Sequence, residues 1–447
     1  MKHARILIIV VTAILTILVL SLFPVWHFGS PVLARAKITT EVQNLTDSNL
    51  RSQLITGGLK APSAMAFIGP NDILVTEKNR GNVQRIINGT ISEQPLLHID
   101  VTKKDERGLL GIATSINNES KKTFVFLYYT EAQLNDAGSP TPDPLGNRVY
   151  RYELVDNKLV NPKLLLDLPA LPGPRHNAGK MAIGPDDNLY VSIGDVDGSF
   201  RGIGTETKAQ NYEDGPAPDG RGGILRITQD GLPVGDGILG NTPILNLYYA
   251  YGIKNSFGFD FDPITGKMWD TENGPTFGDE INVVEPGFNS GWVKVQGIWK
   301  LDVDPLEEPE KEEIAVNRSL DLVDFGGKGS YSSPEFTWSN TVGPTALRFV
   351  SSDKLGEKYK NDIFVGDINY GNIYHFKLNK DRTGFILNGA LADKVASGED
   401  VTEQIEFAEG FGGITDLKIG PDGFLYVLIF QNEDGRIYRI SPITTSQ

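Results

Sequence analysis

Cysteine is absent from the 447-residue chain, and histidine is scarce, with five in all. Without cysteine the protein forms no disulfide, uses no thiol nucleophile and holds no cysteine-ligated zinc. There is no Cys-X-X-Cys-His motif either, so no c-type haem is fused to the chain. The formal net charge of −15 argues against the basic surface that phosphate binding needs, and we expect no nucleic-acid partner.

Long hydrophobic runs are absent too, apart from one at the N-terminus. The run Ile6–Phe23 has 18 residues without a charge and follows the basic residues Lys2 and Arg5. A helix of that length spans about 27 Å, enough for a bilayer core. We predict an N-terminal transmembrane helix or signal peptide over residues 1–28, then a polar tether over 29–50. The protein is then membrane-anchored or secreted, with its folded domain on the extracytoplasmic side.

One short pattern recurs six times: a strand, a tight turn that is often Gly-Pro-Asp, and a second strand of alternating apolar residues. The copies begin at Ser63, Gly108, Lys180, Gly258, Thr345 and Leu417, and a third strand follows each. Such repeats form a closed array of small sheets. The sequence therefore predicts an all-β six-bladed β-propeller over residues 51–442, with its functional site at the axial channel. A strand near Gln53–Thr56 should pair with the last blade and close the ring.

Two long inserts interrupt the repeat, at residues 196–221 and 298–336. Neither shows the apolar periodicity of a helix. A long segment without secondary structure in a compact domain is either a functional loop or disordered. We expect both inserts to form loops over the mouth of the channel.

Only one histidine lies in a setting that suggests chemistry. His176 stands in the loop GPRHNAG before the inner strand of a predicted blade, and Asp195 ends the next strand. Two adjacent strands joined by a tight turn bring such positions within reach of each other. A carboxylate beside an imidazole orients the ring and raises its basicity, as in a general base. From spacing alone, a histidine that only satisfies loop carbonyls is an open alternative.

The segment from Asp270 to Trp292 combines acidic residues with glycine and proline turns. It contains Glu272, Asp279 and Glu280, and also an asparagine at position 282. Calcium takes carboxylate and carbonyl oxygens in flexible geometry, although the spacing is not that of an EF-hand. A calcium-binding loop and an acidic solvated turn both fit this pattern.

Four motifs, in this order, carry a resemblance to a known family. They are ERGLLGI from Glu106, GPRHNAGKMAIGPDDNLYVSIGD from Gly173, GGILRI from Gly222, and the long run Tyr251–Trp292. They resemble the glucose/sorbosone dehydrogenase family over about residues 52–441. Members are known as six-bladed propellers that use pyrroloquinoline quinone (PQQ) and calcium. The resemblance implies an exported quinoprotein that oxidises an aldose sugar at its anomeric carbon and passes electrons to an external acceptor.

The resemblance also assigns roles around the cofactor. His176 falls on the family's catalytic base and Asp195 on the carboxylate that partners it. Lys254 and Asn255 fall on a pair of residues near the quinone carbonyls, and we assign Arg107 to cofactor binding with them.

Five further residues fall on the family's calcium sites. Gly274 and Pro275 match the loop whose carbonyls hold a calcium ion that bridges to the cofactor. Asp279, Glu280 and the carbonyl of Ser290 match a structural calcium site.

The chain departs from the family pattern at its cationic positions. Lys254 stands where the family has arginine, which keeps the charge and loses the bidentate fork. No arginine occurs between Gly410 and Asp416, and a family lysine is replaced near Asn369. Losing such charge-assisted bonds weakens the hold on a tricarboxylate. Two alternatives therefore stay open: a cofactor-less propeller that binds carbohydrate or protein, and a calcium-dependent hydrolase or lactonase.

Overall fold

The described part of the chain is almost entirely strand and loop. The computed structural model describes residues 43–117, 120–197, 206–302, 310–313, 320–431 and 434–443. Its helical elements are the four-residue α2 (Glu399–Thr402) and five short 3-10 helices, at Lys208–Gln210, Leu245–Leu247, Glu357–Tyr359, Gly389–Leu391 and Glu403–Ile405. The predicted all-β propeller class is confirmed. Within the described residues, no helix has both the length and the apolar character needed to cross a bilayer. The predicted anchor or signal peptide, residues 1–28, lies outside the described residues.

The first three large sheets follow the chain from residue 62 to residue 251. The first runs β3 (Pro62–Gly69), β4 (Asp72–Glu77), β5 (Asn82–Ile87), β6 (Thr90–Ile91), with β7 (Leu97–His98) also on β5. The second runs β8 (Leu109–Ile116), β9 (Thr123–Leu134), β10 (Pro140–Val155), β11 (Lys158–Leu168). The third runs β12 (Met181–Ile183), β13 (Leu189–Ile193), β14 (Gly223–Ile227), β15 (Tyr248–Tyr251), then β19 (Phe288–Asn289) and β23 (Ser330–Tyr331).

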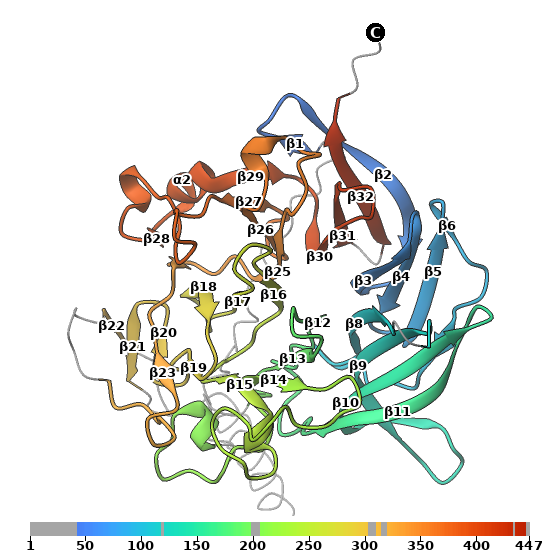
Figure 1. Ribbon diagram of the computed structural model, residues 1–447, viewed down its shortest axis with the longest axis horizontal. Helices are drawn as coiled ribbons and strands as arrows, with labels where there is room; N and C mark the ends of the chain where they lie inside the picture. Colours follow the sequence, from blue (N-terminus) through green and yellow to red (C-terminus); the bar gives the residue numbers. More distant parts are fainter. Residues whose placement is uncertain are drawn as a thin grey trace, which may run out of the picture. The chain divides into compact units, whose positions relative to one another are not determined.

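Three more large sheets contain the remaining three copies of the sequence repeat. The fourth runs β16 (Gly258–Phe261), β17 (Met268–Glu272), β18 (Asp279–Val284), β24 (Phe336–Trp338), β28 (Val395–Ala396). The fifth runs β25 (Pro344–Phe349), β26 (Ile363–Asp367), β27 (Ile373–Phe376), β29 (Glu406–Glu409), β1 (Asn44–Leu45). The sixth runs β30 (Gly413–Ile419), β31 (Leu425–Gln431), β32 (Asp434–Pro442), β2 (Leu50–Leu59). Figure 1 shows the first strand of each repeat, such as β3, β12 and β30, nearest the centre.

The core consists of apolar layers between successive sheets. Leu74 of the first sheet and Leu127 of the second belong to one buried cluster, and Met65 of the first and Leu428 of the sixth belong to another. Equivalent clusters join the second sheet to the third, the third to the fourth, the fourth to the fifth and the fifth to the sixth. The apolar alternation of each repeat thus buries both faces of a sheet against its neighbours.

Strands from distant parts of the chain close the arrangement. β2 pairs antiparallel with β32, with Gln53 opposite Arg439, which confirms the predicted closure. β1 pairs with β29, so the last residues of the predicted tether belong to the folded domain. β28 is exchanged between repeats and pairs parallel with β24.

The second insert differs from the expectation of bare loops. It contributes to a small seventh sheet of β20 (Val295–Gln296), β21 (Trp299–Asp302) and β22 (Glu310–Glu313). Tight turns and short pairings of this kind leave no periodic pattern long enough to detect in a sequence. The first insert is described only in part, because residues 198–205 lie outside the described ranges.

Candidate active site

His176 and Asp195 lie at the same edge of the third sheet. His176 precedes β12 and Asp195 follows β13, and these two strands are antiparallel with Met181 opposite Val191. The hairpin therefore carries the start of one strand and the end of the next to one edge, as the spacing predicts. His176 itself has a positive φ of 57°, which turns the loop back toward that edge.

The structure brings these two side chains into direct contact. His176 Nδ1 lies 2.6 Å from Asp195 Oδ1. The other carboxylate oxygen accepts a 2.8 Å hydrogen bond from Trp292 Nε1, and Asp195 is fully buried. Burial raises the pKa of Asp195, but the His176 ring, Lys254 and Trp292 outweigh it and hold that pKa below its usual value. Asp195 is therefore an ionised acceptor that orients the imidazole.

Lys254 joins this pair at the second ring nitrogen. Its Nζ lies 3.1 Å from His176 Nε2, and its main-chain carbonyl accepts a 3.0 Å bond from the Asp195 amide. An ammonium group has no lone pair, so it donates and Nε2 accepts. The proton of neutral His176 is then on Nδ1, pointing at Asp195. This leaves Nε2 as the basic nitrogen of the site.

Glu106 is a member of the site that sequence reasoning missed. Its Oε2 accepts a 2.6 Å hydrogen bond from the His176 amide and a 3.4 Å bond from Asn255 Nδ2. It ties the second repeat to the loop that carries His176 and brings Asn255 beside that loop. Its place next to Arg107 in the first family motif was the one available signal.

Arg107 contacts the loop that leads to His176. Its guanidinium donates to the carbonyls of Ala170 and Gly173, at 2.5 and 3.1 Å, and it is 5% exposed. Burial lowers its pKa. Arg221 Nη1 donates to Leu171 O in the same loop. In this structure Arg107 positions the loop, and its assignment to cofactor binding stays a prediction.

Gly194 lies where its own strand end, the His176 loop and the Lys254 segment pack against one another. A Cβ at this position would lie 2.4 Å from the carbonyl oxygen of His176 and 2.5 Å from that of Lys254. Neither backbone atom is able to move away as a flexible side chain would. Glycine is therefore required here for the His176 loop to contact the segment carrying Lys254 and Asn255.

A ladder of buried acids lies on β17 and β18. Glu272 is directly opposite Glu280, and Asp270 is opposite Asn282, so all four side chains share one face. Burial raises the pKa of Asp270 to about 7 and that of Glu280 to about 8, and it raises that of Glu272 well above its usual value. Like charges along the ladder add to this effect.

Two carboxylate oxygens of this ladder have no hydrogen-bond partner among the described residues. Asp270 Oδ2 and Glu272 Oε2 are buried and make no hydrogen bond within the described residues. Glu280 is better satisfied, with Ser290 Oγ at 3.2 Å, Asn282 Nδ2 at 3.1 Å and Gln296 Nε2 at 2.9 Å. The predicted neighbours Glu280 and Ser290 are thus brought together, whereas Asp270 was not among the predicted ligands.

Asp279 lies apart from Glu280. The two are consecutive in β18, so their side chains point to opposite faces. Asp279 accepts from the amides of Gly274, Val342 and Gly343 at 2.7–2.8 Å, and its pKa is raised by burial to about 6. It fixes the turn that contains Gly274 and Pro275. Among the described residues, no three acidic or histidine side chains converge at metal-ligand spacing.

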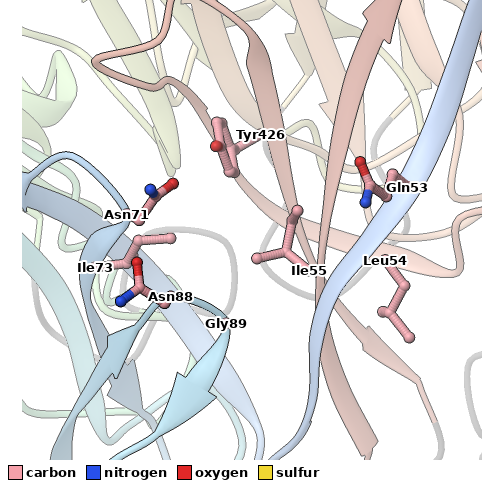
Figure 2. Close-up of a pocket in the computed structure, with 8 residues that line it drawn as sticks. All are labelled: Gln53, Leu54, Ile55, Asn71, Ile73, Asn88, Gly89 and Tyr426. Atoms are coloured by element: carbon pink, nitrogen blue, oxygen red, sulfur yellow. The ribbon is translucent and has the colours of Figure 1, made fainter. Parts of the chain in front are cut away.

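A half-open pocket lies elsewhere, at the seam between the first and sixth sheets. Figure 2 shows its lining, which encloses about 310 Å³ and consists of Gln53, Leu54, Ile55, Asn71, Ile73, Asn88, Gly89 and Tyr426. The Tyr426 hydroxyl donates a hydrogen bond to Asp422. None of the predicted site residues lines this pocket. Its lining includes no histidine, lysine or carboxylate.

Comparison with known proteins agrees with the motifs. The family model for glucose/sorbosone dehydrogenase matches residues 59–439. The chain belongs to this family. The aldose sugar dehydrogenase YliI of Escherichia coli is 24% identical over 420 residues, which cover 92% of this chain and 96% of that protein. Quinoprotein glucose dehydrogenase B of Acinetobacter calcoaceticus is 26% identical over 339 residues, covering 72% of this chain and 69% of that protein.

A solved structure of the PQQ-bound aldose sugar dehydrogenase from Streptomyces coelicolor matches the fold. It is 20% identical, with a TM-score of 0.60, and the match covers 88% of this chain and 99% of that one. At this identity the likeness establishes the shared propeller fold. The predicted family membership is confirmed by the family model over residues 59–439.

Proposed function

We propose that this glucose/sorbosone dehydrogenase family member is an oxidoreductase that oxidises an aldose at its anomeric carbon, with PQQ and calcium. The observation that carries the proposal is the buried contact of 2.6 Å between His176 Nδ1 and Asp195 Oδ1. It leaves Nε2 as a base aimed away from the carboxylate. We count the six large sheets as the six blades that the repeats predict.

In the proposed mechanism His176 Nε2 takes the proton of the anomeric hydroxyl. Asp195 holds the Nδ1 proton and stabilises the imidazolium that forms. The Lys254 ammonium occupies Nε2 in the resting site, so the substrate hydroxyl replaces it there. PQQ, when bound, would supply the two-electron acceptor that this oxidation requires. The sugar product is the lactone.

The cofactor's carboxylates require cationic partners, and this chain offers lysines. Lys254 lies beside the base, and Lys180 and Lys418 meet at Asp416 on the axis. Lysine binds carboxylate as a point charge and lacks the two-pronged geometry of arginine. The chain therefore fits a polyanionic cofactor through a different set of cations from the family pattern.

Calcium fits the acid ladder. Asp270 and Glu272 each present a buried carboxylate oxygen without a described partner, and Glu280 lies opposite Glu272. A bound cation would offset the cost of burying these carboxylates in their charged form. Their oxygen atoms are the ligands that calcium prefers. We propose that the facing pair Glu272 and Glu280 holds it, with Ser290 beside Glu280.

Export is proposed on the N-terminal run alone. The uncharged segment Ile6–Phe23 after a basic start supports an anchor or signal peptide and an extracytoplasmic propeller. The sugar and an external electron acceptor would then meet the enzyme outside the cytoplasm.

The deciding experiment is titration of PQQ into calcium-loaded protein, followed by cofactor absorbance and by dye reduction with several aldoses. We expect saturable binding and sugar-dependent reduction. If no PQQ binds at micromolar concentration and no dye is reduced, the protein is instead a cofactor-less propeller that binds carbohydrate or protein. Calcium-dependent lactone hydrolysis without PQQ would identify the hydrolase alternative.

A further inference from the structure

Loops beside His176 carry an excess of positive charge, although the chain as a whole is strongly acidic. The loops 60–61, 78–81, 99–108 and 169–180 lead into strands of the first three sheets. Together they carry eight lysines and arginines and three acids, in a protein with a net charge of −15. We call the four exposed cations of these loops the basic rim; they are Arg80, Lys103, Lys104 and Arg175.

Hydrogen bonds connect two cations of the basic rim to the loop of His176. Glu106 accepts from the His176 amide through its carboxylate, and its own amide donates to Pro174 O at 3.3 Å. Lys104 O accepts from the amide that follows Glu106, at 3.1 Å. Lys104 and Arg175, the residue after Pro174, therefore flank the acid that positions His176.

Lys78 brings a further cation to the same edge. Its amide donates to Ala61 O at 2.8 Å, and its carbonyl accepts from the Leu109 amide at 3.0 Å. A Cβ on Gly108 would lie 2.6 Å from Lys78 Cγ, so the turn before β8 needs glycine for this side chain to cross it. Its Nζ then donates to Asp105 O at 2.6 Å. The Lys78 ammonium is thus held at the loop that contains Glu106.

The side chains of the basic rim have no partner of their own. None of the four forms an ion pair or a side-chain hydrogen bond within the part of the chain that the structure describes. The turn of Arg80 lies against the start of the 99–108 loop, because the Ile99 amide donates to Gly81 O at 2.9 Å. Asp105 and Asp143 are the acids that act on Arg107 in this loop. They are too few to balance the cations around them.

We propose that the basic rim binds the acidic units of a saccharide whose reducing end is oxidised at His176. This inference rests on the proposed function, which places the anomeric hydroxyl at His176 Nε2, and it names the class of substrate. A sugar held at Nε2 extends its remaining units away from the base, toward the loops that border it. Carboxylate or sulfate groups on those units then meet exposed lysine and arginine side chains.

Local charge decides which ligand this edge attracts. Salt screens exposed charges over about 8–10 Å, so the acidic remainder of the protein has little effect at the rim. A saccharide fits better than an acidic protein, because two cations of the rim flank the acid that holds the His176 amide. The positive charge therefore begins beside the base itself.

The first test measures binding by isothermal titration calorimetry on the intact protein without PQQ. The probes are trigalacturonate and galactotriose of the same linkage, which differ only in their carboxylates. We expect trigalacturonate to bind about tenfold more tightly at low salt, and the difference to shrink at high salt because exposed charges are screened. Equal affinity for the two trisaccharides at low salt overturns the proposal.

Charge reversal makes the outcome specific to the basic rim. The double variant Lys103→Glu/Lys104→Glu should weaken trigalacturonate binding about tenfold and leave galactotriose binding unchanged. Lys354→Glu/Lys380→Glu is the matched control, with the same change in net charge. These two exposed lysines follow the ends of β25 and β27, at the opposite edge of the fifth sheet. If both double variants weaken binding equally, net charge and not the rim is responsible, and the proposal is overturned.

A kinetic arm separates this inference from the proposed function. With PQQ and calcium bound, kcat/KM for trigalacturonate should fall in Lys103→Glu/Lys104→Glu, and kcat/KM for galactotriose should not. The methyl glycoside of trigalacturonate has no free anomeric hydroxyl, so it should bind without reducing dye. Dye reduction without preference for the acidic sugar overturns the substrate class and leaves the dehydrogenase intact. If no sugar reduces dye, the dehydrogenase fails, whereas calorimetry still shows whether the rim binds acidic saccharides.

An acidic electron-accepting protein is the competing occupant of the rim. It would show as reduction of an acidic acceptor protein that is sensitive to salt and lost in Lys103→Glu/Lys104→Glu, with trigalacturonate affinity equal in wild type and variant. That result overturns the saccharide proposal.

Discussion

At the scale of single residues, His176 is held on both ring nitrogens by groups of opposite charge. Asp195 fixes Nδ1 at 2.6 Å, and Lys254 covers Nε2 at 3.1 Å. Asp195 is in turn fixed by Trp292 Nε1. Each group orients the next, so a substitution at any one position should alter how His176 takes up and releases a proton.

Replacing His176 by alanine should lower kcat by about 10²- to 10⁴-fold, the range for loss of a general base. PQQ affinity should change little, because the ring acts on the substrate proton. His375→Gln is the matched control, since His375 forms a similar pair with Asp362 at 2.9 Å in the fifth sheet. Dye reduction and PQQ titration measure both variants. Normal turnover in His176→Ala would remove it from the mechanism.

Trp292→Phe should alter the acid side of the pH profile. It removes a donor that lowers the pKa of Asp195, so that pKa should rise and activity should be lost at a higher pH than in wild type. We expect kcat to fall by about tenfold as well. Trp299→Phe, another buried tryptophan, is the control. A profile identical to wild type in Trp292→Phe would show that this hydrogen bond has no role in the chemistry.

At the scale of elements, strand alternation decides which acids act together. The sequence correctly predicted the hairpin that joins His176 to Asp195, because that contact is local. It grouped Asp279 with Glu280, and the alternation of β18 separates them. Glu106 and Lys180 were missed, because the first reaches the His176 amide from 70 residues away and the second reaches Asp416 from 236. No local pattern encodes such contacts.

Glu280→Ala should test the calcium site on the β17–β18 ladder. In calcium buffer it should lower Tm far more than in EDTA, because the bound ion stabilises only the folded state. Glu335→Ala is the control, since this acid pairs with Lys394 in a partly exposed contact. Differential scanning calorimetry gives the values. Equal shifts in both buffers would contradict the site.

The same ladder predicts the pH dependence of stability. The folded-state pKa values of Asp270 and Glu280 are about 7 and about 8, above those of an unfolded chain. The folded state then binds more protons, so stability is highest near pH 4 and falls as pH rises toward 8. We expect this fall in EDTA and a smaller one in calcium. Asp270→Asn should flatten the EDTA curve, and a curve that rises over this range would contradict the prediction.

At the scale of the whole molecule, the stability of a ring of sheets depends on the strands that close it. Each sheet packs on the next through a buried apolar layer, and the first meets the sixth through Met65, Ile73 and Leu428. The chain ends supply the closing strands, since β2 completes the sixth sheet and β1 extends the fifth. Repeats in a sequence predict this plan well, because every unit must bury its faces against two neighbours.

Deletion of residues 1–59 should therefore destabilise the entire domain, although it removes no residue of the His176–Asp195 edge. Without β2, strand β32 presents an unpaired edge and the buried Leu59 leaves the layer between the sixth and first sheets. We expect a lower Tm, and aggregation by size-exclusion chromatography. Deletion of residues 1–42 is the matched control, because it keeps β1 and β2 and should leave Tm and activity unchanged. If the longer deletion melts at the temperature of the shorter one, closure by β2 contributes nothing to stability, and the ring must be held by its apolar layers alone.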